Sequence, residues 1–469
     1  MAAPDGPSRQ RLTRRAVARW AAPFALVSTV AGAAAGCLPS GAAPSGPGPG
    51  SAPEVQLRYL AWLKEWGETV PQLASRLREQ HRVVLDVELA AVGVTPWQEK
   101  LQALFAADAA PDALQGRANV DPLFQDGGLF LDLASRVQRD KVKIDAATYA
   151  LSGTERWCGK IYSVPHWADP NAVFYNKSLL RQVGAKDPWD DLKGDWTLAQ
   201  YVELARTATR DRDGDGRPDS WGIQWTYNHP SHVGMLAWTL GGDVADFQAQ
   251  RYTLDSPTSI EAHRQLQEWL TRDRVLLPLA EADAIRKETG LEPFQAGRVA
   301  FQVRAVTDVV RNLKAIGNSF EWDVIHLPRA ADGKPGLALA AGHGQVAAAR
   351  TAHPDRAWDA LKFLIAPEAQ EVWAQVNMPA LRSAFGAHLK APPAHVQVFG
   401  DLYARGYGIH FRHHNTAQAW DLYADEGRKV IEGQASLGPG LTELNRRMND
   451  LVRFGSCAPY AGLRHPIRP

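Results

Sequence analysis

Cysteine is scarce in this chain, and so is any large excess of charge of one sign. Only three cysteines occur among 469 residues, so the fold does not depend on a dense disulfide framework. The formal net charge of +1 excludes the strongly basic surface that is typical of nucleic-acid-binding proteins. After the first 36 residues, no uncharged run is long enough to cross a bilayer. The rest of the chain therefore has the composition of an ordinary globular protein, with no nucleic-acid partner.

The first 36 residues have the pattern of an export signal. Arg14 and Arg15 precede an uncharged stretch from Trp20 to Gly36, and small residues close that stretch. The paired arginines indicate the twin-arginine route, and Cys37 after Ala-Ala-Gly resembles the lipobox of bacterial lipoproteins. That resemblance implies cleavage before Cys37 and acylation of its thiol. The alternative is a transmembrane helix, for which these 17 residues are at the lower limit of length.

Residues 37–54 form the next part, which consists almost wholly of Pro, Gly, Ser and Ala. Such a segment buries too little apolar surface to offset its ordering entropy, so it is expected to be a linker. We therefore predict a signal peptide over residues 1–36, a lipidated linker over 37–54 and a folded body over 55–469. The body would lie outside the cytoplasm, anchored to the cell membrane by the lipid on Cys37. Removal of the signal leaves a net charge of about −3.

Two cysteines remain once Cys37 carries lipid, namely Cys158 and Cys457. An exported compartment allows them to form a disulfide. The sequence does not show whether their Cα atoms lie within disulfide reach, so two separate thiols are the alternative.

Helix and strand signals alternate along the body. Val55–Ala61 and Val83–Leu89 are predicted strands, and each is followed by apolar residues at helical spacing. Thr197 and Ser256 are predicted helix N-caps, the first with a capping-box glutamine and the second with proline at the first helical position. This alternation predicts an α/β fold with parallel strands and crossover helices. From Pro354 onward the pattern is almost purely helical.

Several shorter strands are also expected. They are Ile161–Val164, Ala172–Tyr175, Trp322–Ile325 and Gln345–Ala349. The glycine-rich residues 341–344 before the last of these are predicted to form a flexible turn.

Several segments together resemble the bacterial extracellular solute-binding proteins, which are the receptors of ATP-driven sugar importers. They occur in the order of that family and are Ile161–Pro170, Phe174–Lys177, Asp195–Thr197, Leu240–Asp243 and Phe294–Ala300. The resemblance extends from Glu54 to about Ser383, and the C-terminal part matches less clearly. It implies a two-lobed periplasmic-binding-protein-like fold with a ligand cleft between the lobes.

The same resemblance implies a function. The protein would bind a neutral carbohydrate, an oligosaccharide, and deliver it unchanged to the membrane permease of an ABC importer. We expect a monomer that is not an enzyme and requires no cofactor. A polyol or a glycerol phosphodiester remains an alternative solute, because residue types alone do not fix the ligand.

Two other classes of protein remain open, a lipoprotein enzyme that cleaves glycans and a surface adhesion lipoprotein. The sequence contains no Gly-x-Ser-x-Gly, phosphate-loop or His-Glu-x-x-His motif. A glycosidase needs only two suitably placed carboxylates, which a sequence alone does not reveal. An adhesin would be expected to show repeats, and we find none.

Tryptophan gives the strongest indication of the ligand site. Its flat apolar face and single N–H donor suit the face of a pyranose ring, and ligands of α/β sheets bind beyond strand ends. Burial at a lobe interface is the alternative for each candidate. The aromatic candidates are Trp62, Trp66, Trp167, Trp225 and Trp238. The polar candidates are Asn119, Asp169, Asp243, Arg304 and His343.

An aspartate-rich segment suggests a structural calcium site. Asp211, Asp213, Asp215 and Asp219 occupy positions 1, 3, 5 and 9 of a calcium-loop pattern, with glycine at position 6. The pattern departs at position 12, where Gly222 replaces the bidentate glutamate. We therefore expect weak calcium binding or none, and an acidic, solvated turn is the alternative.

Overall fold

The computed structural model describes residues 53–454, apart from residues 91–93, 118–120, 152–155 and 391. The chain divides into Met1–Ala52 and Pro53–Pro469, and the structural description concerns the second unit alone. The predicted signal peptide, Cys37 and nearly all of the predicted linker lie outside the described residues. Among the helices that are described, none combines the length and apolar character needed to cross a bilayer.

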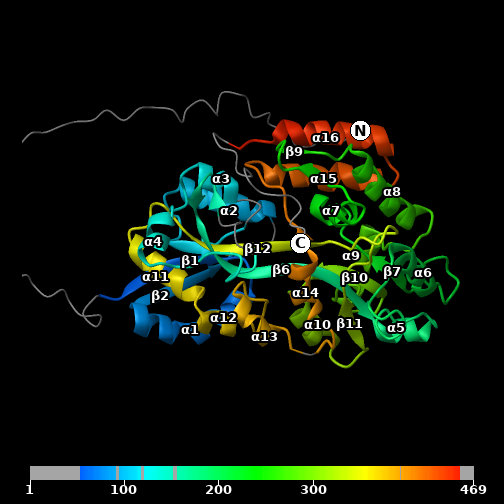
Figure 1. Cartoon of the computed structure of the whole chain (residues 1–469), viewed down its shortest axis with the longest axis horizontal. Helices are drawn as coiled ribbons and strands as arrows, with labels where there is room; N and C mark the ends of the chain where they lie inside the picture. The colour runs from blue at the N-terminus through cyan, green and yellow to red at the C-terminus, as the bar shows by residue number, and fades with distance from the viewer. Residues whose placement is uncertain (1–52, 91–93, 118–120, 152–155, 391, 455–469) are drawn as a thin grey trace, which may run out of the picture. The chain divides into compact units, whose positions relative to one another are not determined.

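Strands and helices alternate along most of this unit (Figure 1). The strands are β1 Val55–Ala61, β2 Val83–Leu89, β3 Ala113–Gln115, β4 Arg156–Trp157, β5 Lys160–Ile161, β6 Ser163–Asn176, β7 Trp221–Gln224, β8 Ala245–Asp246, β9 Arg251–Tyr252, β10 Val299–Ala305, β11 Trp322–Ile325, β12 Ala338–Ala347 and β13 Tyr407–Gly408. The helices are α1 Glu65–His81, α2 Val94–Ala106, α3 Asp121–Asp126, α4 Ala134–Arg139, α5 Lys177–Gln182, α6 Leu198–Ala208, α7 Pro230–Thr239, α8 Pro257–Thr271, α9 Leu279–Thr289, α10 Asp308–Ile316, α11 Pro354–Leu364, α12 Pro367–Trp373, α13 Phe385–His388, α14 Val398–Arg405, α15 Thr416–Ile431 and α16 Leu437–Leu451, with a short 3₁₀ helix at Arg382–Ala384.

The main sheet has the strand order β2-β1-β3-β12-β6-β10-β7, with β11 paired to β6 and β13 paired to β12. Strand β1 pairs in parallel with β2 and β3, and β10 pairs in parallel with β7. Parallel neighbours need crossover connections, which helices such as α1 and α2 supply. Strands β6 and β12 are antiparallel to each other and connect the two parallel parts.

Strand β6 belongs to two lobes. Its residues 163–170 pair with β12, whereas residues 171–176 pair with β10 and β11. We call the part built on β1, β2 and β3 lobe A, and the part built on β7, β10 and β11 lobe B. Strands β6 and β12 run across from one lobe to the other (Figure 1).

Apolar side chains pack on both faces of the sheet in each lobe. In β1 of lobe A, Leu57 packs with α1 and α11, whereas Leu60 packs with α2 on the opposite face. In β6, Val173 and Phe174 likewise belong to separate clusters. Successive side chains of a strand point to opposite faces, so helices cover both sides of the sheet. The predicted α/β fold with two lobes is confirmed.

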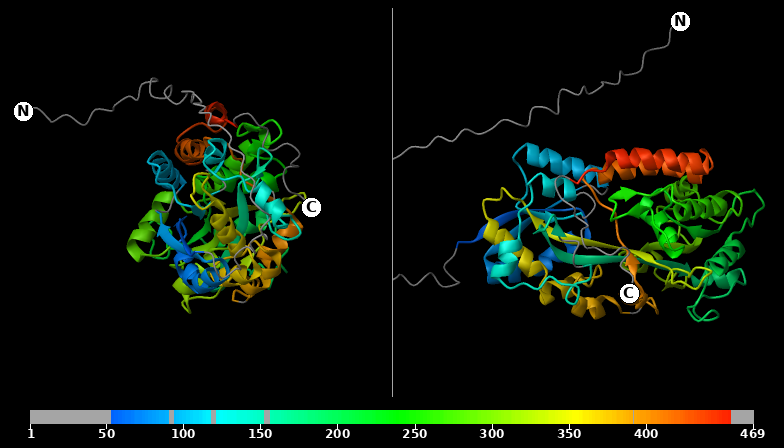
Figure 2. Two further views of the ribbon diagram at one scale, coloured as in Figure 1. Left: turned by 90° about the vertical axis from the view of Figure 1, so that its left-hand side faces the viewer. Right: turned by 45° about the horizontal axis from the view of Figure 1, so that its top comes forward.

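Helices α15 and α16 pack against each other and against α8 of lobe B (Figure 2). Helix α15 also contacts α7 of lobe B and α2 of lobe A. The C-terminal part of the chain therefore reaches both lobes.

The structure corrects the prediction of two short strands around Asp169. Residues Ile161–Val164 and Ala172–Tyr175 fall largely within one 14-residue strand, β6. Pro165 and Pro170 interrupt the β pattern of the sequence, because proline has no N–H to donate to a ladder. The pairing of β12 with β6 accommodates Pro165 by a register shift between His343 and Gly344.

The predicted flexible turn at residues 341–344 is also wrong, because these residues lie in β12. Their glycines allow close packing rather than a turn. A Cβ at Gly342 would lie 2.8 Å from the side chain of Leu151, and one at Gly344 would lie 2.7 Å from Ser163. His343 between them is therefore held on a strand, next to a β-bulge.

Candidate functional site

A cavity of about 790 Å³ lies between the two lobes, within the range of roughly 300–1,000 Å³ that is usual for small-molecule sites. Lobe A contributes Arg117 and the segment after β1, and lobe B contributes Arg304 and the start of α10. The crossing strands contribute Trp167 and Asp169 from β6 and His343 from β12. The cavity therefore lies beyond the carboxyl ends of β1 and β3, where ligands of α/β sheets bind.

Three rings and one guanidinium group form what we call the aromatic corner: Trp62, Trp167, His343 and Arg117. The ring of Trp167 stacks on His343 with centroids 4.6 Å apart, and the ring of Trp62 lies 5.6 Å from that of Trp167. The guanidinium of Arg117 lies 4.3 Å from the centre of the Trp62 ring. Gln115 at the end of β3 accepts a hydrogen bond of 3.0 Å from the backbone N–H of Trp62, which holds this segment in place.

The two tryptophans of the aromatic corner differ in exposure. Trp167 is only 1% exposed, because Trp373 and His166 pack against it from the core. Trp62 is half-buried. Burial, followed by the nearby charge of Arg117, lowers the pKa of His343 to about 3, so this imidazole is neutral at pH 7. Trp62 and His343 are thus the partly exposed rings of the corner, and Trp62 offers the larger aromatic surface.

Four charged side chains of α1, β10 and α10 form what we call the ionic end of the cavity: Glu65, Arg304, Asp308 and Arg311. Arg311 donates to Glu65 at 3.1 Å and to Asp308 at 3.2 Å, and Arg304 lies 3.5 Å from Asp308. Because Glu65 belongs to α1 and Arg311 to α10, this ion pair joins lobe A to lobe B. The same residues border an adjoining cavity of about 490 Å³, which extends the cleft.

Asp169 of β6 also lines the cavity. The Thr307 hydroxyl donates to its Oδ1 at 2.5 Å. Burial raises the pKa of Asp169 to about 6, although the hydrogen bond from Thr307 acts in the opposite direction. The carboxyl group can therefore accept hydrogen bonds from ligand hydroxyls at neutral pH.

A histidine group completes the lining and consists of His229, His232 and His410 with the indole of Trp420. The ring of His229 lies 4.4 Å from Trp420 and 5.2 Å from His232, and His410 lies 5.0 Å from Trp420. His229 caps α7, because its Nδ1 accepts from the backbone N–H of Ser231 at 3.3 Å. Burial lowers the pKa of His229 to about 4, so it is neutral at pH 7.

Five of the predicted site residues line this cavity: Trp62, Trp167, Asp169, Arg304 and His343. Direct contact with a ligand remains a prediction for each of them. Asn119 lies outside the described residues.

The other four predicted residues are placed elsewhere, by packing or by local hydrogen bonds. Trp66 is fully buried against Tyr59, and Trp238 is buried in the core of lobe B. The Trp225 indole donates to the backbone carbonyl of His232 at 3.0 Å, so it helps to hold His232 in position. Asp243 accepts from the two backbone N–H groups that follow it.

The sequence prediction missed Arg117, His229, His232, His410 and Trp420. Arg117 follows β3, a strand of three residues that is too short to stand out in the sequence. His229 precedes Pro230 at the start of α7, and that N-cap and proline pattern was a usable signal. Trp420 lies among other apolar residues of α15, where core packing is the usual interpretation.

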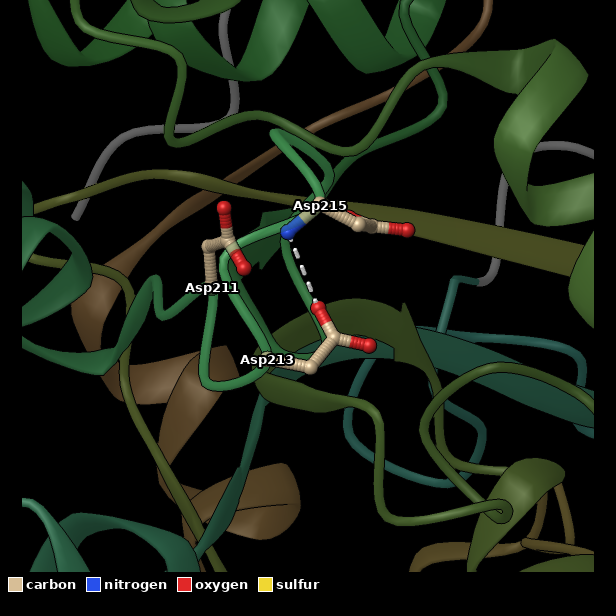
Figure 3. Close-up of side chains that lie close together, drawn as sticks. All are labelled: Asp211, Asp213 and Asp215. Carbon is tan, nitrogen blue, oxygen red and sulfur yellow. Dashed lines mark hydrogen bonds between the residues drawn. The ribbon is translucent and has the colours of Figure 1, made fainter.

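The aspartate-rich segment forms an exposed loop between α6 and β7 (Figure 3). Carboxylate oxygens of Asp211, Asp213 and Asp215 lie within 4.8 Å of one another. Asp219 instead accepts from the backbone N–H of Arg212 at 2.7 Å. Gly222 lies in β7 and offers no side-chain ligand at the twelfth position of the pattern. Calcium binding therefore stays a prediction, with an incomplete ligand set.

Cys158 follows β4 and is disulfide-bonded. Cys37 and Cys457 both lie outside the described residues, so the pairing of Cys158 with Cys457 stays a prediction.

The chain belongs to a family of bacterial extracellular solute-binding proteins, whose sequence model matches residues 72–395. Members of this family are binding proteins that act outside the cytoplasm. The match ends before His410 and Trp420, so one side of the cavity is built from residues that follow it.

Solved structures of sugar receptors share the fold. The chain is similar to an ABC substrate-binding protein from Listeria monocytogenes in complex with cycloalternan, with a TM-score of 0.72, 18% identity, and coverage of 85% of this chain and 98% of that one. It is also similar to the maltose/maltodextrin-binding domain from Bdellovibrio bacteriovorus bound to maltotriose, with a TM-score of 0.68, 15% identity, and coverage of 84% and 99%. A receptor from Streptomyces glaucescens, solved unliganded and with acarbose, gives a TM-score of 0.68 at 17% identity, with coverage of 85% and 99%. Together these likenesses establish the two-lobed solute-binding fold.

Proposed function

We propose that this protein is the receptor of an ABC-type importer, which binds a carbohydrate between its lobes and passes it unchanged to a membrane permease. The observation that carries this proposal is the interlobe cavity, which is lined both by the half-buried Trp62 ring and by hydrogen-bonding groups such as Asp169. Indole faces bind the C–H face of sugar rings, and carboxylates bind their hydroxyls. The carbohydrates present in the similar structures support the same class of ligand.

Replacing Trp62 with alanine is expected to weaken sugar binding by at least about 1 kcal/mol, or roughly fivefold in Kd, because an aromatic ring that lines the cavity is lost. A ligand is first found by a thermal-shift screen over oligosaccharides, and its Kd is then measured by calorimetry for each variant. Trp322→Ala is the matched control, because Trp322 is partly buried on β11 outside the cavity. Equal Kd values for Trp62→Ala and the unaltered protein would contradict the proposed role of Trp62.

Incubation of the protein with the sugars that it binds tests whether it is a receptor or a glycan-cleaving enzyme. Chromatography of the sugar after prolonged incubation is expected to return it intact. Cleavage products would contradict transport as the sole function.

The lipid anchor is a separate part of the proposal. Cys37 follows small residues and precedes a Pro/Gly/Ser-rich stretch, which supports cleavage and acylation at this position. The anchor would keep a monomeric receptor at the outer face of the membrane, close to its permease.

Replacing Cys37 with serine is expected to move the protein from the membrane fraction to the soluble extracytoplasmic fraction, because the thiol that accepts the lipid is removed. Cell fractionation and mass spectrometry of the N-terminal peptide measure this. Ser45→Ala is the matched control, since it changes a residue of the same Pro/Gly/Ser-rich stretch and leaves Cys37 in place. An unmodified Cys37 within a longer, uncleaved chain would contradict the anchor.

A further inference from the structure

The ion pair between Glu65 and Arg311 joins the two lobes beside the cavity. The Nε and Nη2 groups of Arg311 donate to Glu65 Oε1 at 3.2 and 3.1 Å. Glu65 begins α1 of lobe A, and Arg311 lies in α10 of lobe B. Neither residue belongs to β6 or β12, the strands that run across both lobes. The distance between the two side chains therefore depends on how the lobes are oriented.

Each partner is held in position by its own lobe. Trp66, which follows Glu65, is fully buried and stacks on Tyr59 of β1 with ring centroids 5.3 Å apart. In lobe B, Arg311 Nη1 donates to Asp308 at 3.2 Å, one turn earlier in α10. Side chains that are already fixed lose little conformational freedom when they pair, so this ion pair forms at a low entropic cost.

The two charges differ in exposure. The side chain of Glu65 is 7% exposed, whereas that of Arg311 is 42% exposed. Among the described residues, Lys64 also lines the cavity, but Arg311 is the cation that pairs with Glu65. The second carboxylate oxygen, Glu65 Oε2, is buried and accepts no hydrogen bond from the described part of the chain.

This burial determines what the loss of Arg311 would do. Glu65 would become an almost buried carboxylate without its cation, which is a costly arrangement. Separation of the lobes would expose the carboxylate to water and remove that cost. Without Arg311, the arrangement with separated lobes is therefore favoured.

We propose that the Glu65–Arg311 ion pair holds the lobes together before a ligand binds, and that it thereby sets the affinity for every ligand of the cavity. The pair consists of protein groups alone, so it acts without a ligand. A ligand that contacts both lobes binds best when they are together, and its apparent Kd rises as that arrangement becomes less populated. Glu65 and Arg311 are thus positioning residues. Their effect on affinity rests on the carbohydrate function proposed above, whereas their effect on the lobes does not.

Arg311→Met tests the effect on the lobes, because it removes the charge and the donors but keeps a long side chain. In the unliganded, purified full-length protein it is expected to separate the lobes and increase the radius of gyration, which small-angle X-ray scattering measures. Arg181→Met is the matched control. Arg181 pairs with Glu321 within lobe B, and these side chains are 66% and 65% exposed. The control should leave the radius of gyration unchanged.

A second substitution in the same chain tests the role of the buried carboxylate. Glu65→Met combined with Arg311→Met removes both charges and leaves two apolar side chains at the contact. Replacement of a buried ion pair by apolar side chains is often neutral or stabilising. The double variant is therefore expected to restore the radius of gyration of the unaltered protein.

Calorimetry measures the effect on affinity, with maltotriose, cellotriose and any other oligosaccharide that raises Tm in the screen. Arg311→Met is expected to raise Kd by about tenfold, and by a similar factor for each sugar that binds, because the population with the lobes together falls. The double variant should bind within about threefold of the unaltered protein. All measurements are made at a temperature where the Tm of each variant shows that it is folded.

The possible outcomes separate this proposal from the carbohydrate function. An unchanged radius of gyration in Arg311→Met would overturn the role of the ion pair and leave the carbohydrate receptor intact. A double variant that binds sugar more weakly than Arg311→Met would also overturn it, because Glu65 and Arg311 would then contact the ligand directly. A larger radius of gyration in Arg311→Met, with no binding of any sugar in the screen, would support the ion pair and overturn the carbohydrate function.

Discussion

Lowering the pH from 7 to 5 is expected to reduce the free energy of unfolding by several kcal/mol. The reason is a set of six histidines, buried or half-buried, whose pKa values are lowered to about 3 or 4, in each case mainly by burial. They are His166, His229, His263, His326, His343 and His413.

The sign follows from proton uptake by the unfolded chain. Each histidine is protonated below about pH 6.5 when unfolded but stays neutral down to about pH 4 when folded. Stability that is fully present above pH 6.5 is therefore lost as the pH falls, by up to about 2 kcal/mol per histidine between pH 7 and 5. Asp121 and Asp169 act in the opposite direction, because their folded pKa of about 6 exceeds the ordinary value of 3.8. They recover about 1 kcal/mol each, so the histidines dominate.

Thermal unfolding at pH 7, 6 and 5 measures this, and the expected fall in Tm is roughly 10 °C or more. His263→Gln should make Tm less dependent on pH. His263 is a fully buried residue of α8 that is hydrogen-bonded to Tyr423, outside the cavity. His353→Gln, at an exposed position, is the control for the substitution itself. A Tm that stays constant over this range would show that the buried histidines do not determine the acid response.

Replacing Trp167 with alanine is expected to destabilise the protein by about 3–5 kcal/mol and to weaken sugar binding as well. The ring is 1% exposed and packs against Trp62, His166, His343 and Trp373, so its removal leaves a void in the core. The ring also borders the ligand cavity, so the same void deforms the surface that the ligand contacts.

Chemical denaturation measures the stability loss, and calorimetry at a temperature where the variant is folded measures the affinity. Trp167→Phe should recover part of the stability, because a ring then fills some of the void. Trp62→Ala is the comparison from the same corner, with a smaller stability loss because Trp62 is only half-buried. A Trp167→Ala variant as stable as the unaltered protein would contradict the packing described here.

Local signals in the sequence predicted the regular elements well. The predicted strands Val55–Ala61, Val83–Leu89 and Trp322–Ile325 match β1, β2 and β11. The side chain of Thr197 accepts from the backbone N–H of Gln200, and that of Ser256 accepts from Ser259, so both predicted caps are confirmed. These features depend on short-range patterns of apolar and capping residues, which a single sequence displays directly.

Features that depend on neighbouring strands were harder to predict. Prolines and glycines in β6 and β12 look like loop residues in the sequence, yet Gly342 and Gly344 are required by the approach of other chain segments. Tertiary packing of this kind overrides local preference.

The site was predicted only in part, because tertiary packing also decides which residues line it. Residue type and position after a strand identified Trp62 and Trp167, but they also selected Trp66, which turns into the core. Arg117 and His410 are 293 positions apart in the chain and meet only in the folded cavity. A local sequence pattern does not reveal that two residues so far apart in the chain line the same cavity.

The position of His410 and Trp420 after residue 395 has a consequence for how such receptors diversify. The shared lobes can be kept while a C-terminal segment that packs on them is altered. Mutations of Trp420 change one side of the cavity at a position on α15, outside the strands β6 and β12 that connect the lobes. Receptors with the same scaffold can in this way acquire new solutes in small steps, and grafting residues 396–454 between relatives would transfer part of a receptor's solute preference with them.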